Sequence, residues 1–247
     1  MTTKYINIHN LKVGAIIFSR MDSKRLPGKA LVNIGDKPML GRVIDRAKCI
    51  KGIDKIIVAT TFRKIDDEIA NFSKDKGVNV FRGNVEDVAS RAINACNKFH
   101  IEKFARICGD RPFFDPKLIS ILINMHNDFD VDLVTTMFPR TYPPGLTGEV
   151  IKVIALKNAM LSNNDSENRE HLTRYFYENS SKFIIKNYTP DKLLDLKNIK
   201  LVVDNINDLN KAKWIVSKLG KKNDNCNNIE KVIQLEKQWK KINIKNL

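Results

Sequence analysis

Short apolar runs alternate with longer segments of helical period along the first half of the chain. Runs of four to six mainly apolar residues predict β-strands at 13–18, 55–60, 78–81, 104–108 and 132–136. Between them, apolar residues spaced three or four apart predict helices at 37–50, 64–75, 85–100 and 116–127. Strands that alternate with helices are typical of βα units, so the pattern predicts an α/β fold with a mainly parallel central sheet.

The alternation breaks after residue 137, where the segment FPRTYPPGLTGEVIKV contains three prolines and two glycines. Such a segment predicts a turn-rich excursion, either a hairpin or a lobe over the sheet. Beyond it, we expect helices near 155–163, 167–179, 206–219 and 227–240, and strands near 183–187 and 199–203.

Three helix starts carry capping signals. Asp115 precedes a proline, which suits the first position of a helix. Asn84 with Asp87, and Asn205 with Asp208, have the spacing of a capping box, although the usual partner is Glu or Gln. These residues are expected to stabilise the local structure first.

The length of 247 residues fits one α/β domain better than two small ones. We expect a polar N-terminal arm at 1–12, a single domain at 13–240 and a C-terminal tail at 241–247.

Hydrophobic residues make up 43% of the chain and charged residues 29%, as in soluble globular proteins. No apolar run approaches the roughly 18 residues that span a bilayer, and the first dozen residues lack the apolar segment of a secretory signal. Cys49, Cys96, Cys108 and Cys226 form no CxxC pair, which argues against a zinc knuckle or a disulfide framework. We therefore expect a cytoplasmic protein with reduced thiols and no membrane partner.

The formal net charge of +15 raises the alternative of a nucleic-acid partner. The lysines are scattered among Asn and Ile, however, and no basic patch with interleaved aromatic residues is present. A dedicated nucleic-acid role is disfavoured, whereas a small anionic substrate is compatible with the charge.

Basic residues gather directly after the first predicted strand, in the segment SRMDSKRLPGKAL. Ligands of open parallel sheets bind beyond the carboxyl ends of the strands, where this loop is expected to lie. The planar forks of Arg20 and Arg25 and the point charge of Lys29 suit a polyphosphate better than a single carboxylate. The segment is neither a P-loop nor a dinucleotide fingerprint, and a basic loop that only faces water is the alternative.

This segment resembles the signature R-x-x-S-x-R-[LI]-P-x-K of the sugar cytidylyltransferases, which include the enzymes that activate 3-deoxy-octulosonate and sialic acid. The chain is similar above all to the SpsF-like branch of spore-coat polysaccharide biosynthesis. Further blocks follow in the family's order over roughly residues 13–210, namely DKIIVATT, VFRGNVEDVASR, RICGDRPFFDP, PRTYPPGLTGEV, NREHLTRYFYEN and LVVDNINDL. The resemblance implies a three-layer, Rossmann-like nucleotide-diphospho-sugar transferase fold, also called GT-A-like.

The resemblance also implies which residues hold CTP and its metal ion. The residues expected to hold the phosphates are Arg20, Ser23, Arg25 and Lys29. Asp110 and Asp204, each at the end of a predicted strand, would be the ligands of Mg²⁺. Two carboxylates are enough for this ion, because it keeps several waters and takes further oxygens from phosphate. A strand-end aspartate can instead cap a turn or a helix.

Contacts to the nucleotide and to the acceptor are implied less firmly. Arg82 and Asp87 would lie near the cytidine, with Asp87 also a candidate helix cap, and Arg106 would be near the site or in a structural ion pair. The acceptor candidates are Arg140, Tyr142, Glu149, Arg169, Glu170 and His171. This chain has Pro144 and Thr147 where the branch usually has Asp, which leaves the acceptor open.

The expected reaction is attack of an acceptor oxygen on the α-phosphorus of CTP, with release of pyrophosphate and without a protein nucleophile. A nonulosonic or 3-deoxy-octulosonate-type sugar acid is the expected acceptor, and surface polysaccharide or glycoconjugate biosynthesis the expected setting. Open alternatives are transfer to a sugar phosphate or phosphonate, and a nucleotide-sugar glycosyltransferase of related fold. Such a glycosyltransferase usually has a D-x-D metal motif, and the DVD at 130–132 is discounted because it straddles the start of a predicted strand. The family also implies a homodimer, with the excursion at about 138–190 serving the acceptor and the dimer contact.

Overall fold

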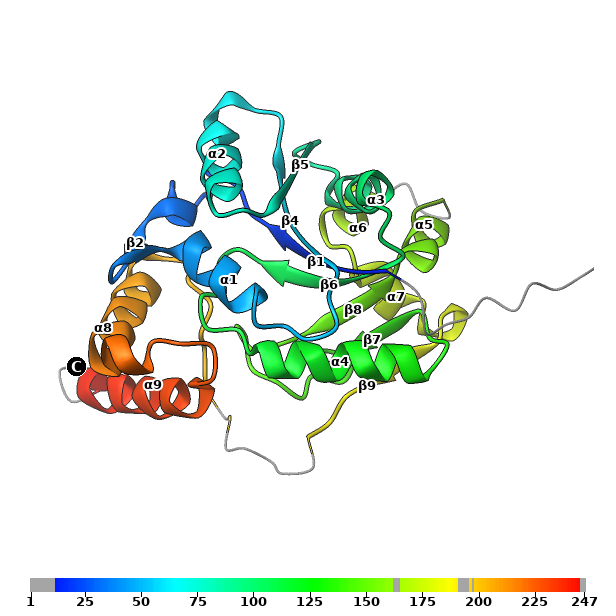
Figure 1. Cartoon of the computed structure of the whole chain (residues 1–247). Helices are drawn as coiled ribbons and strands as arrows, with labels where there is room; N and C mark the ends of the chain where they lie inside the picture. The colour runs from blue at the N-terminus through cyan, green and yellow to red at the C-terminus, as the bar shows by residue number, and fades with distance from the viewer. Residues whose placement is uncertain (1–11, 162–164, 191–195, 197, 245–247) are drawn as a thin grey trace, which may run out of the picture.

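A seven-stranded sheet in the order β5–β4–β1–β6–β8–β7–β9 forms the centre of the computed structural model (Figure 1). Residues 12–161, 165–190, 196 and 198–244 are described. The strands are β1 (Val13–Phe18), β4 (Lys55–Thr61), β5 (Asn79–Gly83), β6 (Lys103–Cys108), β7 (Leu133–Thr135), β8 (Glu149–Lys152) and β9 (Ile185–Asn187). Among these described strands only β8 runs against its neighbours, so the expected mainly parallel sheet is confirmed.

Helices cover both faces of the sheet and give it three layers (Figure 1). One apolar cluster packs the strands against α1 (Met39–Ala47), α2 (Asp67–Asp75) and α4 (Pro116–Asp128). A second cluster packs the opposite face against α3 (Val88–Phe99), α5 (Val153–Leu161) and α7 (Arg174–Glu178). Ile16 and Ile17 of β1 belong to different clusters, because successive strand residues point to opposite faces. This double burial explains the continuous apolar run of β1.

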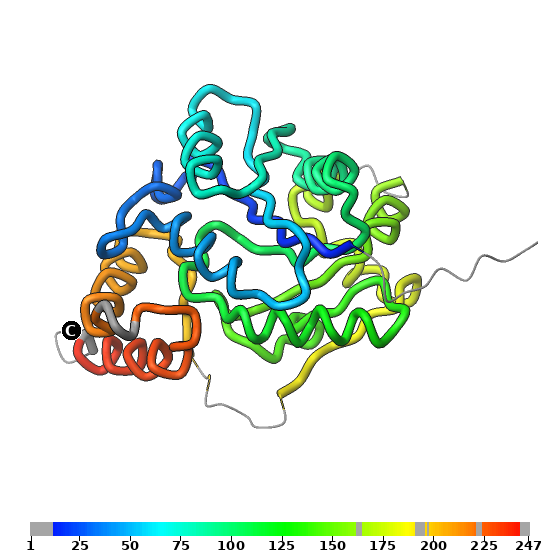
Figure 2. Tube along the Cα trace, viewed as in Figure 1, coloured from blue at the N-terminus to red at the C-terminus, as the bar shows by residue number. Residues whose placement is uncertain are grey.

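The C-terminal helices form a separate cluster beside the sheet. Figure 2 shows α8 (Ile206–Asn223) next to the small hairpin of β2 (Asn33–Ile34) and β3 (Lys37–Pro38). α9 (Ile229–Ile244) packs along α8, and Gly220 interrupts the helical backbone of α8 with a φ of 67°. This cluster also buries Leu201 and Val203, which lead into α8.

Helix caps follow the sequence signals closely. Asp115 accepts a hydrogen bond from the backbone of Lys117 at the start of α4, and Asn205 accepts one from Asp208 at the start of α8. Asp87 caps α3 through the backbone N–H of Ser90. Of the Asn84 and Asp87 pair, Asp87 is therefore the cap.

The second half of the chain departs from several predictions. Of the two expected forms of the excursion after residue 137, the hairpin is confirmed, because the chain returns as β8 antiparallel to β7. The hairpin extends the main sheet, so the alternative of a lobe over the sheet is wrong. The expected strand at 199–203 is wrong: every second residue of the segment is buried, but its N–H groups make only isolated backbone–backbone bonds, to the carbonyls of Leu196, Pro144 and Asp110. The expected helix at 167–179 is two short helices, α6 (Ser166–Glu170) and α7. α9 runs on to Ile244, into the segment expected to be the C-terminal tail, whereas 1–11 and 245–247 lie outside the described residues.

Within the described part of the chain, no helix has the length and apolar character to cross a membrane.

Candidate active site

A cavity of about 460 Å³ opens at the carboxyl ends of β1 and β6. This is the edge at which ligands of parallel sheets bind. The lining comes from the loop after β1, the starts of α1 and α3, the end of β6, the end of α6 and Asp204, two residues before α8. Six basic side chains and three carboxylates line it, namely Arg20, Lys24, Arg25, Lys29, Arg91, Arg106, Asp110, Glu170 and Asp204. The excess of positive charge suits a highly anionic ligand.

Two glycines allow the backbone around the cavity to fold tightly. Gly28 has a φ of 72°, a conformation that favours glycine, and its N–H donates to the carbonyl of Met21 over 2.8 Å. This hydrogen bond closes the loop, and Lys29 follows Gly28 directly. At the end of β6, a Cβ on Gly109 would lie 2.9 Å from the side chain of Ser19, so only glycine lets the two strand ends approach this closely.

The two candidate metal ligands converge on one cation. Lys29 Nζ lies 2.9 Å from Asp110 Oδ2 and 3.6 Å from Asp204 Oδ1, and Arg25 Nη2 lies 3.0 Å from the same oxygen of Asp204. Two carboxylates from segments 94 residues apart in the sequence therefore point toward a single position. The donor set fits a hard divalent cation, which takes carboxylate oxygens and completes its shell with water and phosphate. No group of three His, Cys, Asp or Glu suited to a metal occurs in the described ranges, so the protein would supply only this pair.

Backbone contacts hold the two aspartates beside each other. The N–H of Val203 donates to the carbonyl of Asp110 over 3.0 Å, and Lys29 Nζ donates to the carbonyl of Val203 over 2.9 Å. The backbone N–H of Asp204 donates to Asp208 Oδ2 in the first turn of α8. The first turn of α8, which Asn205 caps, therefore also helps to position Asp204.

Arg106 reaches the cavity from β6 and is paired behind it with Glu149. Their ion pair is 2.7 Å long, and the hydroxyl of Tyr177 donates to the other oxygen of Glu149 over 2.6 Å. Burial by itself raises the pKa of Glu149, but Arg106 and Tyr177 outweigh it and hold the pKa below its ordinary value. Glu149 is therefore a buried counter-charge and does not line the cavity.

Arg91 is a lining residue that the sequence analysis did not single out. Its side chain is almost completely buried on α3, and Nη1 donates to the carbonyl of Asn84 over 2.7 Å. Nε has no hydrogen-bond partner, and no carboxylate of the described residues lies within 4.0 Å of the guanidinium. Burial, and then the charge of Arg20, lowers the pKa of Arg91 to about 10. The sequence held one indication that Arg91 faces the cavity: Val88 and Arg91 lie three residues apart, which places them on the same face of α3.

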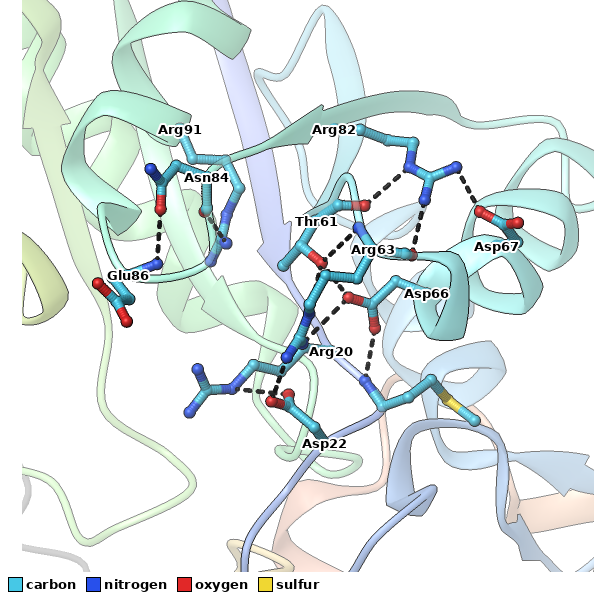
Figure 3. Close-up of polar contacts among 11 residues, drawn as sticks. Arg20, Asp22, Thr61, Arg63, Asp66, Asp67, Arg82, Asn84, Glu86 and Arg91 are labelled. Atoms are coloured by element: carbon cyan, nitrogen blue, oxygen red, sulfur yellow. Dashed lines mark hydrogen bonds and ion pairs between the residues drawn. The ribbon is translucent and has the colours of Figure 1, made fainter.

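The structure brings all four of the expected phosphate residues together but places part of the expected nucleotide set away from the cavity. Arg20, Ser23, Arg25 and Lys29 all line the cavity. Arg82 does not: its guanidinium binds the carbonyls of Thr61 and Arg63 and pairs with Asp67, as Figure 3 shows. The reason is its position on the edge strand β5, next to the turn that follows β4.

Of the expected acceptor residues, two line the cavity and the others lie away from it. Glu170 and His171 line the cavity, and Glu170 lies 3.9 Å from Arg20. Arg169 does not line the cavity, and its guanidinium pairs with Asp87, the cap of α3, over 2.7 Å. Asp87 does not line the cavity either.

Two residues of the excursion also lie away from the cavity. Tyr142 stacks on Tyr188 with 6.3 Å between ring centroids, and burial raises its pKa to about 12. Arg140 is exposed on the loop before β8.

The DVD at 130–132 lies at the start of β7, on the sheet edge opposite the cavity. Asp130 pairs with Lys152, and Asp132 accepts a hydrogen bond from the backbone of Ile184. It is therefore not a metal motif of this site.

A three-layer α/β fold with a cationic cavity at the carboxyl edge of its sheet defines a nucleotide-binding class of protein. Comparison with known proteins narrows that class, because the family model described as Cytidylyltransferase matches residues 14–199. The chain belongs to the cytidylyltransferase family.

Individual relatives agree with this assignment. The chain is 36% identical over 198 residues to the uncharacterized protein MJ1063 of Methanocaldococcus jannaschii, covering 80% of each chain. It is 26% identical over 214 residues to the spore coat polysaccharide biosynthesis protein SpsF of Bacillus subtilis, covering 85% of this chain and 88% of SpsF. Among solved structures, a cytidylyltransferase from Leptospira borgpetersenii superposes with a TM-score of 0.83 at 31% identity, covering 91% of this chain and 94% of that one.

Proposed function

We propose that the protein transfers CMP from CTP to a hydroxyl group of a sugar acid and releases pyrophosphate. The observation that carries this proposal is the convergence of Asp110 and Asp204 on Lys29, inside a cavity lined by further basic residues. A triphosphate brings four negative charges and a divalent cation, and this arrangement offers partners to both.

In the proposed reaction, the acceptor oxygen attacks the α-phosphorus of CTP and forms a new P–O bond. The bond between the α-phosphorus and the bridging oxygen breaks, pyrophosphate leaves with that electron pair, and the hydroxyl proton passes to solvent. Arg20, Arg25 and Lys29 bind the phosphates and stabilise the charge that develops on the leaving group. Positioning of the reactants by this loop supplies much of the acceleration.

Lys29 and Arg25 are paired with carboxylates in the structure. We propose that both side chains exchange these partners for phosphate oxygens, which frees Asp110 and Asp204. The freed pair would hold Mg²⁺, which supplies further charge neutralisation at the phosphates when bound.

The acceptor is proposed to bind beside Glu170 and His171, which line the cavity at the end of α6, with Glu170 3.9 Å from Arg20. Arg106 and Arg20 make this part of the cavity basic, and that favours an acceptor with a carboxylate. A neutral imidazole offers one N–H donor and one acceptor nitrogen, so His171 suits a sugar hydroxyl, which also both donates and accepts. The homodimer and the cytoplasmic location stay predictions.

An acceptor panel tests the proposal. Purified protein with Mg²⁺ and CTP is incubated with 3-deoxy-octulosonate, sialic acid, sugar phosphates and phosphonates, and pyrophosphate release is measured. We expect release with a sugar acid, and none without an acceptor or with ATP or UTP in place of CTP. Release with only a sugar phosphate or phosphonate would replace the proposed acceptor. Failure of CTP to stabilise the protein, together with salt-sensitive binding of random oligonucleotides, would favour a nucleic-acid role.

A further inference from the structure

One carboxylate lies within the basic loop itself. Asp22 stands two residues after Arg20, and its Oδ1 lies 3.4 Å from Arg20 Nε. A negative charge in this position attracts the arginine expected to bind phosphate and repels the phosphate itself. Binding of a triphosphate here therefore requires the charge of Asp22 to be compensated.

Arg63, two residues beyond the end of β4, lies on the other side of Asp22 (Figure 3). Its Nη1 pairs with Asp22 Oδ2 over 2.5 Å. The hydrogen bond from Arg63 is the main cause that holds the pKa of Asp22 below its ordinary value, so the carboxylate stays ionised. Asp22 in turn raises the pKa of Arg63.

A completely buried carboxylate holds Arg63 in this orientation. Asp66 Oδ2 lies 3.3 Å from Arg63 Nη2, and Arg63 Nε donates to Thr61 Oγ1 over 3.2 Å. The other oxygen of Asp66 accepts the backbone N–H of Met21 over 2.8 Å. The loop after β1 is thus attached to the turn after β4 at two neighbouring points, Met21 and Asp22.

Arg82 fixes the backbone of the same turn. Its Nε donates to the carbonyl of Thr61 over 2.7 Å, and its Nη2 donates to the carbonyl of Arg63 over 2.8 Å (Figure 3). The third nitrogen pairs with Asp67 in the first turn of α2. These contacts link Arg82 on β5 to Arg20 at the cavity through Arg63 and Asp22.

We propose that Arg63 is a positioning residue of the nucleotide site: it neutralises Asp22 and leaves the guanidinium of Arg20 available to the triphosphate. Without Arg63, Arg20 is the one cation of the described residues within 4.0 Å of Asp22, so Asp22 would hold Arg20 alone and keep a negative charge beside the phosphate-binding loop. The inference rests on the proposed function, because it concerns how this cavity binds CTP.

A double-mutant cycle on CTP binding tests the inference, with dissociation constants measured by calorimetry for the wild type, Arg63→Gln, Asp22→Asn and the double variant. We expect Arg63→Gln to weaken CTP binding by about tenfold or more, because it leaves Asp22 unpaired. In the Asp22→Asn background, the same substitution is expected to weaken binding by less than about threefold. The loss caused by Arg63→Gln should be smaller for CMP than for CTP, because CMP carries less charge.

Lys152→Gln is the matched control, since it breaks a 2.6 Å ion pair with Asp130 at the opposite edge of the sheet. Its affinity for CTP is expected to equal that of the wild type. Equal losses from Arg63→Gln in both backgrounds would mean that Arg63 acts through Asp66 and Thr61 alone, and would overturn the inference. Absence of CTP binding by the folded wild type would overturn the proposed function and the inference with it, so the two failures are distinguishable.

Discussion

Lys29 Nζ donates to Asp110 Oδ2 over 2.9 Å, so the site neutralises one of its carboxylates with a residue that is also placed to bind phosphate. The Lys29 side chain is only 13% exposed, and the pair is partly screened from solvent. An ammonium group and a divalent cation compete for the same carboxylate. Under the proposed function, binding of the nucleotide with a metal ion would require Lys29 to change partners, so we expect both residues to be sensitive to substitution.

Asp110→Asn keeps the shape of the side chain and removes its charge. We expect turnover to fall by about 100-fold or more, because the site loses one of its two convergent carboxylates. Pyrophosphate release measures turnover, and circular dichroism with thermal melting shows whether the variant is folded. Turnover like that of the wild type would remove Asp110 from the metal assignment.

Lys29→Ala removes the cation between the two aspartates. The KM for CTP is expected to rise by about tenfold or more, because a charge-assisted bond to phosphate is lost. Lys37→Ala is a suitable control, since Lys37 pairs with Asp45 over 2.6 Å outside the cavity. Equal KM values for the two variants would contradict the phosphate role of Lys29.

Arg91→Met replaces a buried charge by an apolar side chain of similar length. We expect the free energy of unfolding to rise by about 1 kcal/mol, because the native site buries a guanidinium without a carboxylate partner. CTP binding is expected to weaken at the same time, because the cavity loses a positive charge. Urea unfolding and calorimetry measure the two quantities, and a variant that is less stable but binds CTP normally would show that Arg91 is purely structural.

The predictable part of the fold is the part in which each strand is buried on both faces. β1 reads as a continuous apolar run because two helical layers cover it. The sequence did not predict β8, because this strand follows a segment rich in proline and glycine, and such a segment predicts turns. The segment 199–203 has the composition of a strand, yet its neighbours offer it only isolated backbone partners. Such pairing depends on distant parts of the chain and has no local signal.

A site residue could be predicted from the sequence where a suitable residue type directly follows a predicted strand. Asp110 follows β6 directly, and the carboxyl end of a parallel strand opens on the binding edge. Arg82 also lies near the end of a strand, but two backbone carbonyls of the adjacent turn bind its guanidinium. The direction of a long side chain depends on such neighbours, which only the folded structure shows.

His126 on α4 makes stability depend on pH. Neither ring nitrogen has a hydrogen-bond partner among the residues that the structure describes, and burial, followed by the charge of Lys103, lowers the pKa of His126 from 6.5 to about 4. Lys152 acts in the same direction and Asp130 opposes it. Below pH 6.5 the unfolded chain binds a proton at this residue that the folded protein does not, so stability falls with pH until about pH 4.

The size of this effect can be measured against a variant that does not titrate. We expect His126 to cost the wild type about 2 kcal/mol of stability between pH 7 and pH 5, given about 1.4 kcal/mol per pH unit below its unfolded pKa. In His126→Leu this contribution is absent. Urea unfolding of both proteins at the two pH values gives the difference, and parallel losses of stability would contradict the assignment.

Glu149 is expected to matter for stability more than for binding of the acceptor. Glu149→Gln leaves Arg106 buried without its counter-charge, and this should lower the free energy of unfolding by about 3 kcal/mol. The contribution of Glu149 is present above its unfolded pKa and is lost as pH falls through its lower folded pKa, so the difference between variant and wild type should shrink in acid. His171→Ala is the comparison, because His171 lines the cavity and its loss should raise the KM for the acceptor instead. If Glu149→Gln unfolds like the wild type while its acceptor KM rises, Glu149 contacts the acceptor after all.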